Sequence, residues 1–427
     1  MLLFPQQLKT NKIGTQMEIL HILSTFNGGA GAASYKIIRC LQKSSKFNHR
    51  VIFKHGQQKI ENALKISTSK RLPAAQINRL MFSLAKKGRA KGFEAYTPTN
   101  VFVNSKDIKP LIDASNIIHL HWLGDWHFDL KQIFDFIPKD MPVIITMHDM
   151  HFITAGCHYS SGCNAHHSAC EKCPQIPGLF GRFLSKKSHY EKLTAYSNHK
   201  IILVPASSWL ESETHASSLG KIANKIYKIG YPIPLVKEAI DPIVAAKRLE
   251  LMPTLKKKVL LVAQDLSNPR KGSSLLLQAL EKNLLPNCTV ITVGEQVAMS
   301  HPDLFQLGFI KDKELMRCAY AYSDVLCLPS LEENLAQTGL ESLAEGTAVV
   351  CFKNTGPGDY VHDLKTGMNC PSKTYSDLAK TILACLKDKN LTNKSMVRSA
   401  YKAQHEMAYH EQVVVNQYEN LYESSTL

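Results

Sequence analysis

The sequence predicts an α/β protein with two doubly wound parallel sheets that face a cleft, and three observations support this fold class. The chain has 427 residues, which is long for one hydrophobic core and indicates two domains. Short apolar runs bounded by glycine, proline or polar residues alternate with longer amphipathic segments, as strands alternate with helices in parallel sheets. Prolines gather at residues 231–234, which indicates a domain boundary near residue 235.

The strands are expected where apolar, β-branched runs end in glycine or polar residues. In the first half these runs lie at residues 17–24, 49–53, 115–122, 142–151 and 200–204, and in the second half at residues 257–263, 289–294, 324–328 and 348–352. A first strand that opens at Met17 leaves residues 1–16 as an expected disordered leader.

The composition is that of a globular protein, with 44% hydrophobic and 20% charged residues. No apolar run approaches the ~20 residues that span a bilayer. The N-terminus also lacks the basic segment and long apolar core of a signal peptide. The eleven cysteines are an odd number at low density, which argues against a disulfide framework. We therefore expect a cytoplasmic protein.

Positive charge is concentrated near the N-terminus. The formal net charge is +15, and residues 1–110 carry 19 Lys and Arg against 4 Asp and Glu, so the remainder is close to neutral. Such a patch suits an anionic membrane, an acidic acceptor or a nucleic acid. Residues 71–91 mix lysines and arginines with apolar residues such as Leu80 and Phe82. This mixture suggests a helix bound reversibly to the inner face of the cytoplasmic membrane, although a solvated basic face is the commoner explanation of such a segment.

Two segments of the first half place candidate ligand-binding groups at the carboxyl ends of strands, where open α/β sheets bind ligands. Gly29 and Gly31 follow the first strand in the run NGGAGAAS, which allows a tight turn and presents a helix N-terminus to an anion. His148 ends the apolar run PVIITMHD. Each signal is weak alone, because such turns often only connect elements and a strand-end histidine is usually structural.

In the second half, a strand, a loop and a helix follow one another at residues 324–346. The apolar run 324–328 precedes PSLEENLAQTGLESLAEG, in which the loop carries Glu333 and a short helix carries Glu341. The helix N-terminus can bind a phosphate, and the two carboxylates can reach opposite ends of a ligand bound there. Upstream, Arg270 and Lys271 precede a glycine and a helix and can neutralise a diphosphate, although such pairs are often only surface charges.

Four cysteines lie close together, at Cys157, Cys163, Cys170 and Cys173. In a reducing compartment, clustered thiols are typical of a tetrahedral zinc site that stabilises a loop with little core of its own. The Cys170–Cys173 pair has the regular CxxC spacing, whereas the Cys157–Cys163 pair is more widely spaced. The alternative is therefore that these cysteines are free thiols. Because all four ligands would come from the protein, such a zinc would be structural rather than catalytic.

Together these segments resemble the family-four retaining glycosyltransferases, which have the GT-B fold of two Rossmann-like domains. The likeness rests on the E-x7-E segment with its trailing GTAVV, on GGAGAA, TMHD and PASSWL, and on the Lys271–Gly272 pair. The loop GCHY…C…CEKCP resembles that of a bacterial polysaccharide-associated branch of the family. The chain departs from the family pattern at Gln264, near which a glycine and an arginine normally stand.

The resemblance implies roles for individual residues. It makes Glu333 the contact to the transferred sugar, Lys271 the counter-charge of the diphosphate, and His148 a contact to the donor sugar and its developing charge. Glu341 would hold the ribose hydroxyls. The other residues that it assigns to the donor are Gly29, Gly31, Arg270, Asn334, Leu335 and Thr338. No catalytic metal is implied, because cationic side chains and helix N-termini take over that role.

The implied organisation is an acceptor-side domain at residues 17–235, with its cysteine-rich loop at residues 157–173, and a nucleotide-sugar-binding domain at residues 236–400. Residues 401–427 are expected to form a helix that crosses back to the first domain. The expected reaction moves a hexosyl group from a nucleotide-sugar, with retention, to a polysaccharide or lipid-linked saccharide. The product would belong to the cell envelope, as exopolysaccharide, capsule or lipopolysaccharide.

Two alternatives remain. A zinc-containing nucleic-acid-binding protein would explain the basic segment and the cysteines. However, the chain shows neither a recognisable nucleic-acid-binding fold nor aromatic residues interleaved with the basic ones, so nucleic acid is not an expected partner. A non-transferring relative, such as a sugar-nucleotide epimerase, would share the fold but would not release a nucleoside diphosphate in the presence of an acceptor.

Overall fold

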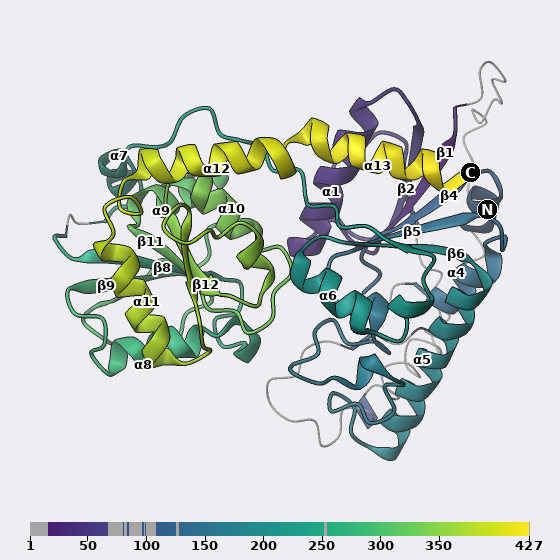
Figure 1. The fold of residues 1–427 in the computed structure, drawn as a ribbon, viewed down its shortest axis with the longest axis horizontal. Helices are drawn as coiled ribbons and strands as arrows, with labels where there is room; N and C mark the ends of the chain where they lie inside the picture. Colours follow the sequence, from purple (N-terminus) through teal and green to yellow (C-terminus); the bar gives the residue numbers. More distant parts are fainter. Residues whose placement is uncertain are drawn as a thin grey trace.

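The computed structural model describes residues 16–66, 80, 83–84, 96–97, 99, 108–124, 128–251 and 254–426. Within these residues the chain forms two domains, each built on an open parallel sheet with helices packed against it (Figure 1). The predicted α/β fold class is therefore confirmed. The expected leader, apart from Gln16, and almost all of the basic segment 71–91 lie outside the described residues.

The first sheet has seven parallel strands in the order β3-β2-β1-β4-β5-β6-β7. They are β1 (Glu18–Ile22), β2 (Asn48–Phe53), β3 (Ala63–Lys65), β4 (Ile117–Leu120), β5 (Pro142–Met147), β6 (Lys200–Pro205) and β7 (Lys225–Ile226). The direction of winding reverses between β1 and β4, and doubly wound sheets bind ligands at such a switch point.

The second sheet has six parallel strands in the order β10-β9-β8-β11-β12-β13. They are β8 (Lys257–Ala263), β9 (Cys288–Gly294), β10 (Leu304–Gln306), β11 (Val325–Leu328), β12 (Ala348–Phe352) and β13 (Gly367–Cys370). Its winding reverses between β8 and β11, so each domain has one switch point.

The strands are apolar on both faces, because helices cover both faces of a parallel sheet. In β1, Ile19 packs into the apolar cluster on one face, whereas Leu20 and Ile22 pack into the cluster on the other. The helices described in the first domain are α1 (Gly28–Lys43), α3 (Lys109–Asp113), α4 (Leu130–Phe136), α5 (Leu179–Asn198) and α6 (Ser208–Ala216). Those of the second are α7 (Pro242–Arg248), α8 (Ser273–Glu281), α9 (Lys313–Tyr322), α10 (Gln337–Ala344) and α11 (Tyr375–Lys387).

Two segments cross between the domains. Residues 227–241 form the first crossing without helix or strand. At the end of the chain, α12 (Lys394–Ala408) packs against α10 and α13 (Glu411–Thr426) packs against α1, so the chain returns to the first domain near residue 410 (Figure 1, yellow). The two crossings are joined where the Ile233 N–H donates to the Tyr409 carbonyl oxygen (3.0 Å). In the described part of the chain, no helix has both the length and the apolar content needed to cross a membrane.

Candidate active site

The carboxyl ends of strands from both sheets border one cleft of about 860 Å³. The first domain contributes the loop after β1, Trp122 after β4 and His148 after β5. The second domain contributes the end of β8, the residues around Lys271 and the loop 333–338 after β11. Both switch points therefore face the same space, which is where open α/β sheets bind ligands.

The glycine-rich turn forms the N-terminus of α1 at the edge of this cleft. Asn27 precedes the helix without a side-chain cap, so the first-turn N–H groups are available to an anion. Gly29 lines the cleft, and a Cβ there would have no atom within 4 Å. Gly31 does not line it, and a Cβ there would come within 2.4 Å of the Phe26 backbone. Gly31 is thus a packing residue in this structure.

Glu333 is an ionised carboxylate held between two cations. Its Oε2 lies 2.6 Å from Lys271 Nζ and 3.3 Å from Arg270 Nη1. Burial would raise the pKa of Glu333, but the two cations outweigh burial and hold the pKa at about 2. Arg270 Nη1 also donates to the Glu332 carbonyl oxygen (2.7 Å), which fixes the guanidinium at the base of the loop.

A glycine brings these cations close to Glu333. Arg270 and Lys271 lie in the short 3-10 helix η5 (Pro269–Lys271), and Gly272 ends it with φ 64°. A Cβ on Gly272 would stand 1.8 Å from the Pro329 carbonyl oxygen, so only glycine allows the turn to approach the end of β11. The Leu331 N–H donates to the Arg270 carbonyl oxygen (2.7 Å) and closes this contact.

His148 is buried, and its tautomer follows from its neighbours. Ser34 Oγ donates to the Ala30 carbonyl oxygen (2.9 Å), so it must accept from His148 Nε2–H (3.0 Å). The neutral ring then accepts at Nδ1 from the Tyr231 hydroxyl (2.9 Å). Burial lowers the pKa of His148 to about 4. At neutral pH His148 is therefore an uncharged ring with both nitrogens hydrogen-bonded to the protein.

Asn334 joins the loop after β11 to the first domain. Its Nδ2 donates to the Met147 and His148 carbonyl oxygens (3.2 and 3.1 Å) and to the Tyr231 hydroxyl (3.1 Å). Its Oδ1 accepts from Ser207 Oγ (2.8 Å). The side chain is therefore used for contacts between the domains, although the residue also lines the cleft.

The remaining predicted donor residues lie at the start of α10. Leu335 is buried, and both it and Thr338 line the cleft. Glu341 lies one turn further along α10 and is not among the lining residues. Its carboxylate accepts from the Tyr320 hydroxyl (3.2 Å) and stands 3.8 Å from Lys36 Nζ of α1. The structure thus places Glu341 at the edge of the site, where it faces the first domain.

The cysteine-rich loop also reaches the cleft, which sequence reasoning missed. The Glu332 carboxylate accepts hydrogen bonds from Ser160 Oγ (3.0 Å) and from the N–H groups of Ser161 (3.0 Å) and Gly162 (2.7 Å). The Tyr159 ring centre lies 3.8 Å from the guanidinium carbon of Arg270, a cation–π contact. These partners are far apart in the sequence and have no local signal, so only the folded chain reveals the contact.

Asp149 is a second buried carboxylate that sequence reasoning passed over, although it follows His148 directly. Its Oδ2 accepts from Trp122 Nε1 (2.8 Å) and lies 2.7 Å from His158 Nδ1. Burial would raise the pKa of Asp149, but His158 and His151 lower it to about 2. Trp122, Asp149 and His158 line the first-domain wall of the cleft.

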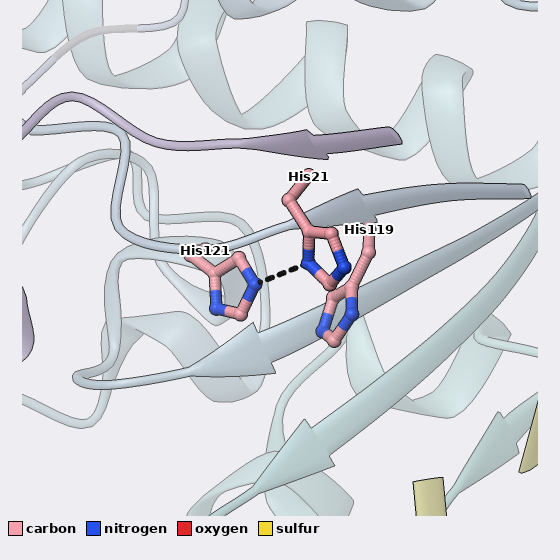
Figure 2. A group of neighbouring side chains, drawn as sticks. All are labelled: His21, His119 and His121. Atoms are coloured by element: carbon pink, nitrogen blue, oxygen red, sulfur yellow. Dashed lines mark hydrogen bonds between the residues drawn. The ribbon is translucent and has the colours of Figure 1, made fainter. Parts of the chain in front are cut away.

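Behind this wall, histidines form a buried row on the first sheet. Figure 2 shows His21, His119 and His121 side by side, with His21 Nδ1 hydrogen-bonded to His121 Nε2 (3.0 Å). His21 Nε2 forms a hydrogen bond with His49 Nδ1 (2.9 Å). His119 Nδ1 forms one with the Tyr422 hydroxyl of α13 (2.7 Å). Because His21 and His119 use both ring nitrogens in hydrogen bonds, this row is a polar network that fastens α13 to the sheet.

No disulfide bond joins the four cysteines assigned to zinc. The sulfurs of Cys157 and Cys173 lie 3.7 Å apart, and Cys170 is buried in the same small apolar cluster. In the described residues, two groups place three metal-binding atoms within 4.8 Å of one another, and neither includes a cysteine. The four-cysteine zinc site therefore stays a prediction.

Two parallel doubly wound sheets that face one cleft, with a last helix returning to the first domain, define the GT-B fold. The solved structure of sucrose-phosphate synthase from Thermosynechococcus elongatus superposes with a TM-score of 0.64 at 16% identity, over 96% of this chain and 99% of that one. HepE from Anabaena, solved with UDP-glucose, superposes with a TM-score of 0.60 at 14% identity, over 96% and 100%. The chain thus has the GT-B fold.

Sequence comparison adds a family model and a curated relative. Residues 247–403 match the family model described as glycosyl transferases group 1. The chain is also 22% identical over 244 residues to an Escherichia coli K12 protein provisionally named colanic acid biosynthesis glycosyl transferase WcaC. This match covers 55% of the chain and spans 59% of the length of that relative.

Proposed function

We propose that the protein is a retaining glycosyltransferase that moves a sugar from a nucleotide-sugar donor to a saccharide acceptor. The observation that carries the proposal is the group of Glu333, Arg270 and Lys271 at the carboxyl end of the second sheet. An ionised carboxylate beside two cations suits a donor that has sugar hydroxyls at one end and a diphosphate at the other. These residues lie in the part of the chain that matches the group 1 family model.

In the proposed reaction, the bond between the anomeric carbon and the diphosphate oxygen breaks, and its electron pair leaves with the nucleoside diphosphate. The acceptor hydroxyl oxygen forms the new bond on the same face of the sugar, and its proton passes to the departing phosphate. Lys271 and Arg270 stabilise the negative charge that grows on the phosphate. The phosphate competes with Glu333 for these cations, which frees the carboxylate for the sugar hydroxyls.

The comparisons support a choice of substrates to test first. HepE was solved with UDP-glucose, and WcaC is named for colanic acid biosynthesis. We therefore propose a uridine diphosphate sugar as donor and a polysaccharide or lipid-linked saccharide of the cell envelope as acceptor. The acceptor would enter along the first-domain wall, where Trp122 and the Gly29 loop line the cleft.

Reversible contact with an anionic membrane is a further part of this proposal. It rests on the charge surplus of residues 1–110 and on the exposed side chains of Leu80 and Leu84. Sedimentation with anionic and neutral vesicles tests it, with Lys86, Lys87, Arg89 and Lys91 changed to Glu. Binding to anionic vesicles that is lost in the variant and at high salt would support the proposal. Equal binding to both vesicle types would refute it.

The transferase proposal is tested with purified protein, a panel of nucleotide-sugars and saccharide acceptors, followed by mass spectrometry. The expected result is a nucleoside diphosphate together with an acceptor one sugar heavier. Glu333→Gln should abolish both products, whereas the surface variant Glu314→Gln should retain them. An altered nucleotide-sugar without release of diphosphate would instead identify a non-transferring enzyme such as an epimerase.

A further inference from the structure

Three side chains outside the cleft converge where the cysteine-rich loop meets α6. His166 and His167 lie in the short 3-10 helix η3 (Ala165–His167), and Glu213 lies on α6. One atom from each, two ring nitrogens and a carboxylate oxygen, lies within 4.8 Å of the others. We propose that His166, His167 and Glu213 form a zinc site that fastens the cysteine-rich loop to α6.

The distances suit a single ion. Glu213 Oε2 lies 2.9 Å from His166 Nε2 and 3.7 Å from His167 Nε2. Ligands at the ~2.0–2.2 Å bond lengths of zinc stand about 3.4 Å apart in a tetrahedron. The two observed separations bracket this value, and the third, between the two histidine rings, is within 4.8 Å, so side-chain rotation can bring the three atoms to one ion.

The hydrogen bonds of His166 show that its lone pair faces this point. His166 Nδ1 lies 3.1 Å from the Cys163 carbonyl oxygen, which can only accept, so Nδ1 carries the proton. In the neutral ring the lone pair is then on Nε2, 2.9 Å from Glu213 Oε2, so these two acceptors can be joined only by a cation, either a proton or a metal ion. A shared proton joins only two of the three converging atoms, whereas a divalent cation can bind all three at once. A backbone carbonyl that holds the second nitrogen is also the usual support of a metal-bound histidine.

The backbone holds the site in place, and solvent can reach it. The Ser218 N–H donates to the His166 carbonyl oxygen (3.0 Å), which joins η3 to the segment just after α6. The His166 side chain is 2% exposed, whereas those of His167 and Glu213 are 41% and 29% exposed. An ion can therefore enter from the open side, where a water completes the tetrahedron. Two imidazoles, a carboxylate and a water form a ligand set that zinc accepts.

This site differs from the two other candidates in the described residues. In the buried row of Figure 2, His21 and His119 already use both ring nitrogens in hydrogen bonds, and no carboxylate offsets the charge of an ion. The cysteine pair Cys157–Cys173 offers sulfur ligands. The proposed site offers only nitrogen and oxygen ligands, which makes it distinguishable by spectroscopy.

The site is placed to influence the cleft through the loop. The segment immediately before it, residues 160–162, binds the Glu332 carboxylate next to Glu333. A metal that holds the loop on α6 would limit the motion of that segment. The metal site itself does not depend on the proposed transferase activity.

The test uses metal-stripped full-length protein titrated with cobalt(II), which replaces zinc and absorbs visible light. Thiolate-bound cobalt also gives intense near-ultraviolet charge-transfer absorption, which cobalt bound to nitrogen and oxygen lacks. We expect one equivalent of cobalt that gives visible bands only, and that zinc displaces. His167→Ala and Glu213→Gln should weaken this binding at least about tenfold. The matched control is His215→Ala, which removes an exposed histidine on α6, the helix that carries Glu213. This variant should bind cobalt like wild type.

The variants keep the test decisive. His167 is half exposed and Glu213→Gln preserves shape, so both should fold; circular dichroism and melting temperature without metal check this. Zinc should raise the melting temperature of wild type and of Cys170→Ser. It should raise the melting temperature of Glu213→Gln much less. The proposal is overturned if all bound cobalt shows thiolate absorption. It is also overturned if His167→Ala and Glu213→Gln bind as tightly as the control.

Discussion

The ammonium nitrogen of Lys271 lies 2.6 Å from Oε2 of Glu333, across 62 residues of sequence. Arg270, on the same short turn, reaches the same oxygen at 3.3 Å. The cationic end of the proposed donor site is therefore occupied by the protein's own carboxylate. A bound diphosphate would take over these cations, so binding of the donor and release of Glu333 are coupled.

Removal of the Lys271 ammonium should impair catalysis more than stability. Lys271→Ala leaves the departing diphosphate without a counter-charge, and we expect a loss of about 2–4 kcal/mol in transition-state stabilisation. Steady-state kcat/KM for the best donor measures this effect. Lys311→Ala, which removes an exposed lysine of the same domain, is the control. A Lys271→Ala rate within about twofold of wild type would contradict the assignment.

The tautomer of His148 can be observed directly. Because the Tyr231 hydroxyl donates to Nδ1 and Ser34 accepts from Nε2, we expect the neutral Nε2–H form in nitrogen-15 NMR spectra at pH 7. Tyr231→Phe removes the donor and should produce a mixture of tautomers with a lower kcat. Tyr227→Phe, at a more exposed tyrosine, should change neither. A protonated Nδ1 in wild type would show that the hydrogen bonds of His148 to Ser34 and Tyr231 do not have these directions.

Gly29 and Gly31 should respond differently to alanine. A Cβ at Gly31 meets the backbone of Phe26 within 2.4 Å, so Gly31→Ala should reduce the free energy of unfolding by about 1–3 kcal/mol. A Cβ at Gly29 meets nothing within 4 Å, so Gly29→Ala should change it by less than about 0.5 kcal/mol. Gly29→Ala should instead weaken binding in the cleft. Urea unfolding and donor titration separate the two effects, and equal stability of both variants would contradict the packing role.

The buried histidines should make the fold acid-sensitive. Burial lowers the pKa of His49 and His148 from 6.5 to about 4, and the pKa values of His21, His119 and His121 are lowered as well. Below pH 6.5 the unfolded chain binds protons that the folded chain excludes. Stability is therefore fully present above pH 6.5 and is lost as the pH falls toward 4. At pH 5.5 each such histidine should cost about 1 kcal/mol relative to neutral pH.

Urea unfolding at pH 7.5 and pH 5.5 measures this loss. The difference between the two pH values should shrink in His119→Gln, which removes one titrating ring from the row. The exposed His215→Gln should retain the wild-type difference. Equal stability of wild type at both pH values would show that these histidines do not titrate as burial predicts.

The cysteine cluster gives a separate prediction about metal content. The 3.7 Å between the sulfurs of Cys157 and Cys173 is close to the edge of a tetrahedron with ~2.3 Å zinc–sulfur bonds. If all four thiols bind zinc, elemental analysis should find a zinc, separate from the one proposed at His166, His167 and Glu213, that Cys173→Ser loses and Glu213→Gln retains. That loss should lower the melting temperature before it affects donor affinity. If Cys173→Ser retains the full zinc content of wild type, the four thiols do not bind zinc and only lie near one another.

The sequence by itself determined the local structure. Apolar β-branched runs such as β5 and β12 were recognisable because a strand buried on both faces needs apolar residues at nearly every position. Turn residues were equally informative: Gly272 and Gly346 have positive φ values of 64° and 82°, which favour glycine. The acidic loop and helix at residues 333–341 also stood out, because their spacing is short.

Only the tertiary structure decided which side chains meet. Lys271 pairs with Glu333, Tyr231 holds His148, and Asn334 bridges the domains, although the members of each contact are 62 to 186 residues apart. Nothing in the sequence around His166 indicates Glu213 as its partner. Such contacts depend on how sheets, loops and domains pack, and the free energy of packing is shared over many residues. Local composition therefore predicts the elements but does not identify the contacts between them.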